Sequence, residues 1–483
     1  MSKKIMIVAV FVGISLLAGC GTGTGASSAN LRATDSSSSG GSSNSSSGGS
    51  GSGTTGTPTL TLSPSWPRVV IGGTQQFTTS ETNVTWAVNG IPGGNDIVGT
   101  ISPAGLYTAP AVVPLDPVIS IWVTAKGSGS TTYTHANVGA LTGNQFAYVS
   151  SASDNSIQVF KADVKTGTLQ PTSTFTVGTG TAPTELAVAP NGKYLYSLNR
   201  GSNDIAIYAI DPATGDLSSA GTVPTPNGPF AMVFSAKGDF AYVSCDGAST
   251  IEAYALNLST GALNPLSGAS YAAGAGRVQS LAISPDGKFL YAANRDSNKI
   301  IGLAINPVDG GLSPIAGSPF SAQSGLSSIA VAGFLYAGSD NGIEAYDRDS
   351  LTGALTYVPT ATQTAAGKAP ELFRNVSDEL LIGVNPQSGI AFNYAFDYLG
   401  LPPGGIWPGG PLVSTGTSPV AGAWMWHEGA FVNWVYILNR QSDPSSSTGS
   451  IGVYQVDYNK GLVGPTSTIP TALHDPTGFV ITP

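Results

Sequence analysis

The chain contains 483 residues, with 19 Lys and Arg against 28 Asp and Glu and a formal net charge of −9. Because nucleic-acid binding requires clustered cations, this balance argues against a nucleic-acid partner. Two cysteines, and three histidines without metal-ligand spacing, argue against a disulfide framework and a zinc site. We therefore expect neither a metal nor a cofactor.

Residues Met1–Cys20 are predicted to be an export signal. Two lysines precede Ile5–Leu17, an apolar run that is too short to span a bilayer but typical of a signal core. The residues that end at Cys20 resemble a bacterial lipobox. This resemblance implies cleavage before Cys20, lipidation of its thiol and anchoring in the cell envelope. The alternative is an ordinary cleaved signal followed by an unrelated cysteine. Gly21, in place of an Asp retention signal, favours the outer membrane or the cell surface.

Gly21–Thr57 consists almost entirely of Ser, Gly and Thr. Such a segment cannot bury enough apolar surface to fold. We expect a disordered tether that holds the folded part of the chain away from the membrane.

Pro58–Leu141 is predicted to be a separate β-sandwich. Short alternating stretches such as VTWAVN and VISIWVTA are separated by turn residues, which is typical of small sandwiches. Gly72–Phe77, Trp86–Gly90 and Gly105–Pro110 resemble bacterial Ig-like domains. The resemblance implies a spacer or an adhesive module, with Trp86 in its core.

An internal repeat organises the rest of the chain. Glu185–Leu217 returns as Gln279–Leu312, and Ala231–Leu263 is a looser copy between them. Each copy alternates strand-like stretches with turns, and its last turn holds a glycine shortly before a leucine. The intervals between these glycines are close to the roughly 40–50 residues of a four-stranded propeller blade, and the last interval is longer. We therefore predict an all-β, seven-bladed propeller. The turn glycines are Gly167, Gly215, Gly261, Gly310, Gly353, Gly400 and Gly461.

The two ends of the repeat region complement each other. The first copy opens at Phe146 with a segment that matches the second strand of the other copies, and Pro476–Pro483 matches their first strand. We therefore predict that the C-terminal strand completes the first blade. Closure of this kind removes the open edges of the ring.

The phrases YLYSLNRGSNDIAIYAIDPATGDL and FAYVSSASDNSIQVFKADVKTGTL resemble the lactonase-like seven-bladed propellers. That family includes bacterial 6-phosphogluconolactonase and the YVTN-repeat surface proteins. The resemblance covers about Gln145–Pro483. It is specific for the fold and says less about function, because one fold hosts many functions.

The last two blades are the least regular. Pro402–Pro411 is expected to replace the usual last strand and turn of the sixth blade, and Gln441–Gly449 is a polar insertion. Trp424, Trp426 and Trp434 lie close together in the sequence. They are predicted to fill gaps between blades, and the alternative is a platform on which carbohydrate stacks.

In a propeller, the binding site is expected where the entry segments of the innermost strands meet the central channel. Two acidic residues in these segments, Glu185 and Glu371, are candidate bases. The entry segments also contain Arg277, Gln279, Ser327, Ser328, Arg374, His474 and Asp475. Three arginines follow repeat-equivalent asparagines at the end of the second strand: Arg200, Arg295 and Arg440. All six cations are candidate binding residues, although the periodic arginines are also explained by structural hydrogen bonds to loop carbonyls.

Lactonases of this family carry an Arg-His pair at an entry segment and Asn-Glu at the end of a second strand. Here no entry segment has Arg-His, and Asn-Arg stands three times where the resemblance implies Asn-Glu. Glu185 and Glu371 belong to blades on opposite sides of the ring, so they need not act together. A catalytic site is therefore not the favoured interpretation.

Two functions remain open. The first, which we favour from the sequence, is a lipid-anchored binding or scaffold protein that recognises an envelope protein or a glycan. The alternative is a lactone hydrolase, in which a glutamate activates water and arginines stabilise negative charge. An exported enzyme would not meet the intracellular phosphorylated lactone of 6-phosphogluconolactonase, so its substrate would be a different, extracytoplasmic sugar lactone.

Overall fold

The fold is described from a computed structural model of the chain. It describes residues 60–140, 145–176, 180–359, 371–374, 380–396, 406–408, 413–415, 417–426, 433–441, 448–457 and 461–482. The elements in these ranges are the strands β1–β41, which confirms the all-β prediction. Within the same ranges, no helix is long and apolar enough to cross a membrane. The predicted signal, its Cys20, the tether and Gly400 lie outside the described residues.

The N-terminal domain is formed by two main sheets and one short strand pair. The first sheet has the order β2 (Arg68–Val70), β11 (Thr131–Gly139), β10 (Val118–Ala125), β5 (Val84–Val88) and β6 (Ile91–Pro92). The second has the order β3 (Thr74–Gln76), β9 (Leu106–Thr108), β8 (Gly99–Ile101) and β7 (Gly94–Asn95). The short pair is β1 (Leu62–Ser63) with β4 (Thr78–Thr79).

Both sheets of this domain contribute to one apolar core. Ile121 and Val88 from the first sheet belong to the same buried cluster as Ile101 and Tyr107 from the second. Trp86 is buried in that cluster, in the place that the sequence predicted. The relationship to Ig-like domains stays a prediction.

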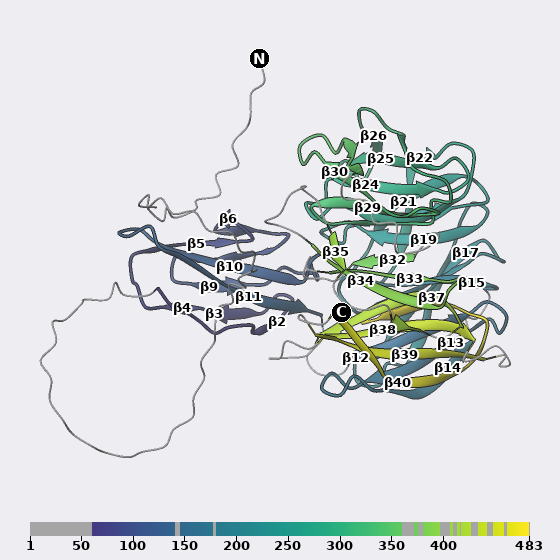
Figure 1. Cartoon of the computed structure of the whole chain (residues 1–483), viewed down its shortest axis with the longest axis horizontal. Helices are drawn as coiled ribbons and strands as arrows, with labels where there is room; N and C mark the ends of the chain where they lie inside the picture. The colour runs from purple at the N-terminus through teal and green to yellow at the C-terminus, as the bar shows by residue number, and fades with distance from the viewer. Residues whose placement is uncertain are drawn as a thin grey trace, which may run out of the picture. The chain divides into compact units, whose positions relative to one another are not determined.

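The remaining strands form seven antiparallel sheets, one for each predicted blade (Figure 1). The first two blades contain β41 (Pro476–Ile481), β12 (Gln145–Ser151), β13 (Ser156–Ala162), β14 (Leu169–Thr176); β15 (Pro183–Val188), β16 (Tyr194–Asn199), β17 (Asp204–Ile210), β18 (Leu217–Pro224). The third and fourth contain β19 (Pro229–Phe234), β20 (Phe240–Cys245), β21 (Thr250–Leu256), β22 (Leu263–Ala272); β23 (Val278–Ile283), β24 (Phe289–Asn294), β25 (Lys299–Ile305), β26 (Leu312–Pro314), β27 (Phe320–Ser321). The fifth contains β28 (Ser328–Val331), β29 (Phe334–Ser339), β30 (Gly342–Arg348), β31 (Leu355–Tyr357). The last two contain β32 (Glu371–Arg374), β33 (Leu380–Asn385), β34 (Ile390–Phe396), β35 (Ile406–Pro408), β36 (Val413–Ser414); β37 (Thr417–Trp426), β38 (Asn433–Gln441), β39 (Thr448–Asp457), β40 (Gly461–His474).

The ring closes through the C-terminal strand, as predicted. Strand β41 pairs antiparallel with β12, with Ala147 opposite Ile481 and Val149 opposite Phe479. The first and seventh blades share a buried cluster, and their blue and yellow strands lie side by side in Figure 1. Closure therefore buries apolar side chains as well as pairing the edge strand.

Neighbouring blades are joined by a repeated contact between a tyrosine and a turn glycine. In each case the hydroxyl of a tyrosine on a second strand donates to the carbonyl of the glycine in the next blade. The bonds are Tyr148 to Gly215 (2.9 Å), Tyr196 to Gly261 (2.9 Å), Tyr242 to Gly310 (3.1 Å), Tyr291 to Gly353 (2.6 Å) and Tyr436 to Gly167 (2.9 Å). The bond of Tyr436 links the seventh blade to the first.

The turn position requires glycine for two reasons. Gly261 has φ +74°, a conformation that costs an L-residue strain. A Cβ at Gly261 would also lie 2.4 Å from the Cδ1 atom of Tyr194 in the preceding blade. Five of the glycines that marked the repeat in the sequence are thus sites where a Cβ would meet an aromatic ring of the preceding blade: Gly167, Gly215, Gly261, Gly310 and Gly353.

Two details of the last blades differ from the prediction. Strand β35 lies inside the segment that was expected to replace the last strand of the sixth blade, and it pairs with β34 as a last strand does. Gly461 is the first residue of β40, opposite Asp457, and not part of a turn.

Trp434 is 5% exposed in the cluster shared with the first blade, which confirms packing between blades for this tryptophan. The side chains of Trp424 and Trp426 lie outside the described residues.

Candidate active site

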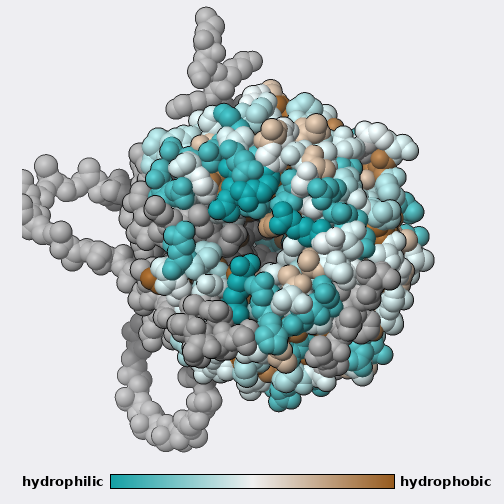
Figure 2. Space-filling model, turned by 90° about the vertical axis from the view of Figure 1, so that its right-hand side faces the viewer, coloured by the Kyte–Doolittle hydropathy of each residue, from teal (hydrophilic) through white to brown (hydrophobic). Residues whose placement is uncertain are grey.

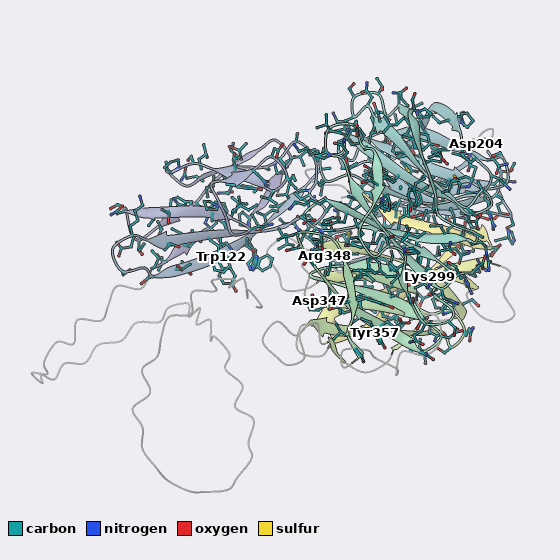
Figure 3. The ribbon with its side chains drawn as sticks, turned by 90° about the horizontal axis from the view of Figure 1, so that it is seen from above. Trp122, Asp204, Lys299, Asp347, Arg348 and Tyr357 are labelled. Atoms are coloured by element: carbon teal, nitrogen blue, oxygen red, sulfur yellow. The ribbon has the colours of Figure 1, made fainter. Side chains whose placement is uncertain are left out.

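The inner strands surround a central cavity of about 800 Å³. Figure 3 distinguishes the two faces of the propeller: Asp204 and Lys299, which begin third strands, lie toward one face, and Arg348, which ends a third strand, lies toward the other. Arg200 and Arg440 precede third strands and line the cavity at the first of these faces. Figure 2 shows that face, with a central hollow bordered by hydrophilic residues.

Inner strands carry a bulge at the same place in several blades. In β15 the pairing with β16 shifts between Pro183 and Glu185, so that Thr184 is the extra residue. The same shift occurs between Pro229 and Ala231 in β19, and it recurs in β23 and β37. A bulge breaks the strict alternation of side chains. Accordingly, both Thr184 and Glu185 line the cavity.

Two of the seven blades carry a glutamate at this position of the repeat, Glu185 in the second blade and Glu371 in the sixth. In the remaining five blades the equivalent residues are small and uncharged. By strand register they are Ala231, Ser280, Ser328, Ala421 and Gly478. Because most blades have no charged residue here, the architecture of the repeat does not require one. Of the two glutamates, Glu185 is the one whose side chain the structure describes, and it lines the cavity, so it is the stronger functional candidate.

The surroundings of Glu185 keep its carboxyl group neutral at neutral pH. The group lies in the wall of the cavity, and burial raises its pKa to about 8, against a smaller opposing effect of a hydrogen bond from the backbone of Met232. Gly478 of the first blade passes close by, because a Cβ there would lie 3.1 Å from the Cα atom of Glu185. A carboxyl group that titrates near pH 8 is suited to proton transfer under physiological conditions.

Hydroxyl groups around the cavity tie the inner strands together. Each bond joins a Ser or Thr to the backbone of the next blade. Two threonines donate to carbonyls, Thr477 to that of Pro183 (2.7 Å) and Thr184 to that of Pro229 (3.2 Å). Two serines accept from backbone N–H groups, Ser280 from Ile329 (3.1 Å) and Ser328 from Leu372 (3.0 Å). Ser328, a candidate from the sequence, is therefore used in holding the fifth blade to the sixth.

The cavity arginines are paired with carboxylates. Arg200 lies 2.9 Å from Asp246 of the next blade, whose side chain is fully buried. Burial raises the pKa of Asp246, and Arg200 opposes that shift. Arg440 lies 3.2 Å from Asp475, and both are about half exposed. The positive charges of Arg200 and Arg440 are thus each matched by a negative charge.

The other two candidate arginines of the fourth blade also have side-chain partners. Arg295 donates to the Oε1 atom of Gln279 at 3.1 Å, and Arg277 forms a forked pair with Asp296, at 2.8 Å for its Nη2 atom. The prediction of structural bonds to loop carbonyls is therefore incomplete, because these partners are carboxylates and an amide.

Asp246 is a residue that the sequence reasoning missed. It occupies the third blade's equivalent of the position that holds Arg200 in the second and Arg295 in the fourth. A reversal of charge at one position of a repeat was the signal that could have identified it.

The remaining candidates take no described part in the cavity wall. His474 is exposed and pairs through its Nδ1 atom with Asp154 at 3.1 Å. Glu371 and Arg374 belong to β32, and their side chains lie outside the described residues. Among the described residues, no group of three or more His, Cys, Asp or Glu is arranged to hold a metal ion.

Comparison with known proteins supports the assignment of the fold. A family model for the lactonase seven-bladed β-propeller matches residues 125–280 and 220–367. Among curated proteins, no sequence matches the chain. A candidate 6-phosphogluconolactonase from Bacteroides uniformis has a TM-score of 0.59 and 17% identity over 70% of this chain and 100% of its own.

A second solved structure, the periplasmic gluconolactonase PpgL of Pseudomonas aeruginosa, has a TM-score of 0.58 and 18% identity, and the match covers 71% of this chain and 99% of that one. At such identities the likeness shows the propeller fold alone. The match to the family model spans half of the chain and includes the second to fourth blades, where Glu185, Arg200 and Asp246 lie. The chain therefore belongs to the lactonase family of seven-bladed β-propellers.

Proposed function

We propose that the propeller is a lactone hydrolase whose reaction takes place in the central cavity. The observation that carries this proposal is Glu185, a carboxyl group with a pKa of about 8 that lines the cavity. Family membership adds to it, because the family is that of the lactonase propellers. This proposal reverses the preference drawn from the sequence, where binding ranked first.

The chemistry needs one group that first accepts and then returns a proton. The reactive form is the ionised one, whose share grows as the pH approaches the pKa of about 8. In that form the Glu185 carboxylate takes a proton from water as the water oxygen attacks the lactone carbonyl carbon. The bond between that carbon and the ring oxygen then breaks, and the proton passes from Glu185 to the departing oxygen, which gives a hydroxy acid. Arg200 and Arg440 line the same cavity, and they would share their N–H groups between their carboxylate partners and the developing oxyanion.

The charge of the rim favours a lactone without a phosphate group. Arg200 and Arg440 are already paired with Asp246 and Asp475, so a phosphate would have to displace a carboxylate. We propose that the substrate is an uncharged sugar lactone outside the cytoplasm, met by a chain anchored through Cys20. The name of the periplasmic gluconolactonase from Pseudomonas aeruginosa describes a similar substrate class for a protein of this fold.

Hydrolysis by the full chain tests the proposal, with glucono-, galactono- and 6-phosphogluconolactone as substrates and the spontaneous rate subtracted. We expect turnover of the uncharged lactones, and a loss of at least a hundredfold in kcat for Glu185→Gln. Glu252→Gln is the matched control, because Glu252 bonds Ser270 and does not line the cavity. Equal activity of the Glu185→Gln variant would refute the role of this residue. No turnover by folded protein would return the binding or scaffold interpretation to first place.

A further inference from the structure

The outer face of one sheet in the N-terminal domain carries aromatic rings where polar side chains are expected. In β10, Ile119, Ile121 and Val123 point into the core, and Ser120 and Trp122 alternate with them on the outside. A sheet with one face on the core normally presents polar side chains on the other. The outer face of this sheet therefore requires an explanation that the fold of the domain does not supply.

Four rings form a continuous row on that face, and we call them the aromatic strip: Trp66, His135, Tyr133 and Trp122. The ring centroids lie 4.6 Å apart for Trp66 and His135, 5.3 Å for His135 and Tyr133, and 4.5 Å for the stacked pair Tyr133 and Trp122. Trp122 and Tyr133 are direct cross-strand neighbours. Figure 3 shows Trp122 at the surface of the domain.

The aromatic strip is accessible and is bordered by hydroxyl groups. Tyr133 is 52% exposed. Ser120 contacts the Nδ1 atom of His135 at 3.3 Å, and at the other end the hydroxyls of Thr124 and Thr131 lie 3.1 Å apart. Desolvation lowers the pKa of His135, so its ring is uncharged at neutral pH. The strip thus combines apolar ring faces with neutral hydrogen-bonding groups.

We propose that the aromatic strip binds a neutral polysaccharide chain. A pyranose ring has a face of C–H groups that packs on the negative face of an aromatic ring, and hydroxyls at its edge that suit neutral hydrogen-bonding partners. From His135 of the strip to the bordering hydroxyl of Thr131, this face runs for about 13 Å along β11, which is longer than a single sugar ring. An extended chain therefore fits it better than a monosaccharide does.

Two other occupants fit less well. The strip is two strands wide, so it covers on the order of 100–200 Å², far below the roughly 800 Å² that each partner buries in a stable protein interface. A second copy of the chain is therefore a poor occupant. The predicted tether Gly21–Thr57 offers Leu31 as its one large apolar side chain, so it cannot cover four rings.

Affinity electrophoresis of the full chain tests the proposal, in gels that contain hydroxyethyl cellulose, glucomannan or xylan. We expect retardation in at least one of these gels, and a dissociation constant at least tenfold weaker for Trp122→Ala and for Tyr133→Ala. Tyr133→Phe keeps the ring and should stay within threefold of the original chain. Circular dichroism of each variant establishes that it folds.

Tyr357→Ala is the matched control, because Tyr357 is an exposed aromatic residue of the propeller, 39% accessible and outside the strip (Figure 3). The proposal is wrong if none of the neutral polysaccharides slows the migration of the chain. An equal loss in the Tyr357→Ala control would also overturn it. Light scattering supplies the last check: a dimer that Tyr133→Ala dissociates would show that a second copy occupies the strip.

Discussion

The contact between a turn glycine and the preceding blade can be measured with two substitutions in one blade. Gly261 and Gly268 have nearly the same backbone conformation, with φ +74° and +70°. A Cβ at Gly261 would lie 2.4 Å from the ring of Tyr194, whereas a Cβ at Gly268 would have nothing within 4 Å. The pair therefore separates the strain of the backbone from the contact between blades.

The expected effects follow from these distances. Alanine at either glycine costs about 1–2 kcal/mol for the left-handed conformation. At Gly261 the ring must also move, and overpacking of this kind costs about 1–3 kcal/mol. Tyr194 resists movement because its hydroxyl donates to the carbonyl of Ser259 at 2.6 Å. The same shift would also break the hydrogen bond from the Tyr196 hydroxyl to the carbonyl of Gly261, whose loss costs about 1 kcal/mol.

We therefore expect Gly261→Ala to lower the free energy of unfolding by about 3–6 kcal/mol and Gly268→Ala by about 1–2 kcal/mol. Equilibrium unfolding in urea, followed by circular dichroism in the full chain, gives both values. Equal losses in the two variants would refute the reasoning, because they would show that the turn glycines serve only the backbone conformation.

Two further predictions concern the cavity and the closure of the ring. Glu185 stays neutral in the folded chain up to about pH 8 but ionises near its usual value of 4.5 when unfolded, so the free energy of unfolding should fall as the pH rises from 4.5 to 8, by about 1.4 kcal/mol per pH unit. Urea unfolding across this range should show that slope in the original chain and a flatter one in Glu185→Gln; parallel curves would contradict the raised pKa. Tyr436→Phe removes the hydroxyl that bonds Gly167 across the closure and should cost about 1 kcal/mol, with Tyr148→Phe as the control between consecutive blades; a loss much larger than in the control would show that the closure depends on this one bond.

Much of the propeller was predictable because a blade is a local unit. Its strands follow one another in the chain, and a glycine at a fixed place in the sequence identifies the hairpin turn between two of them. Gly261 and Gly310 could be recognised as blade marks without knowledge of the tyrosines that bond them. The closing strand was predictable for the same reason, since Pro476–Ile481 repeats the pattern of β15.

The site was predictable only as a set of candidates. The repeat placed Glu185 and Arg200 near the channel, but it could not distinguish a working carboxyl group from a bystander. The raised pKa that singles out Glu185 comes from burial beside other blades, where Gly478 passes close to it, and a hydrogen bond from the backbone of Met232 opposes it. Asp246 was missed for a related reason, because it pairs with Arg200 only once the second and third blades pack side by side.

The amino-acid sequence by itself determined the all-β class, the number of blades and the way in which the ring closes, since hydrophobic alternation and turn chemistry act over a few residues. Only the tertiary structure decided that burial raises the pKa of Glu185, that Arg200 and Arg440 are already paired, and that Trp66, just before β2, continues the row of rings on β10 and β11. Desolvation and charge pairing depend on distance through space, and that distance is set when the blades and sheets pack.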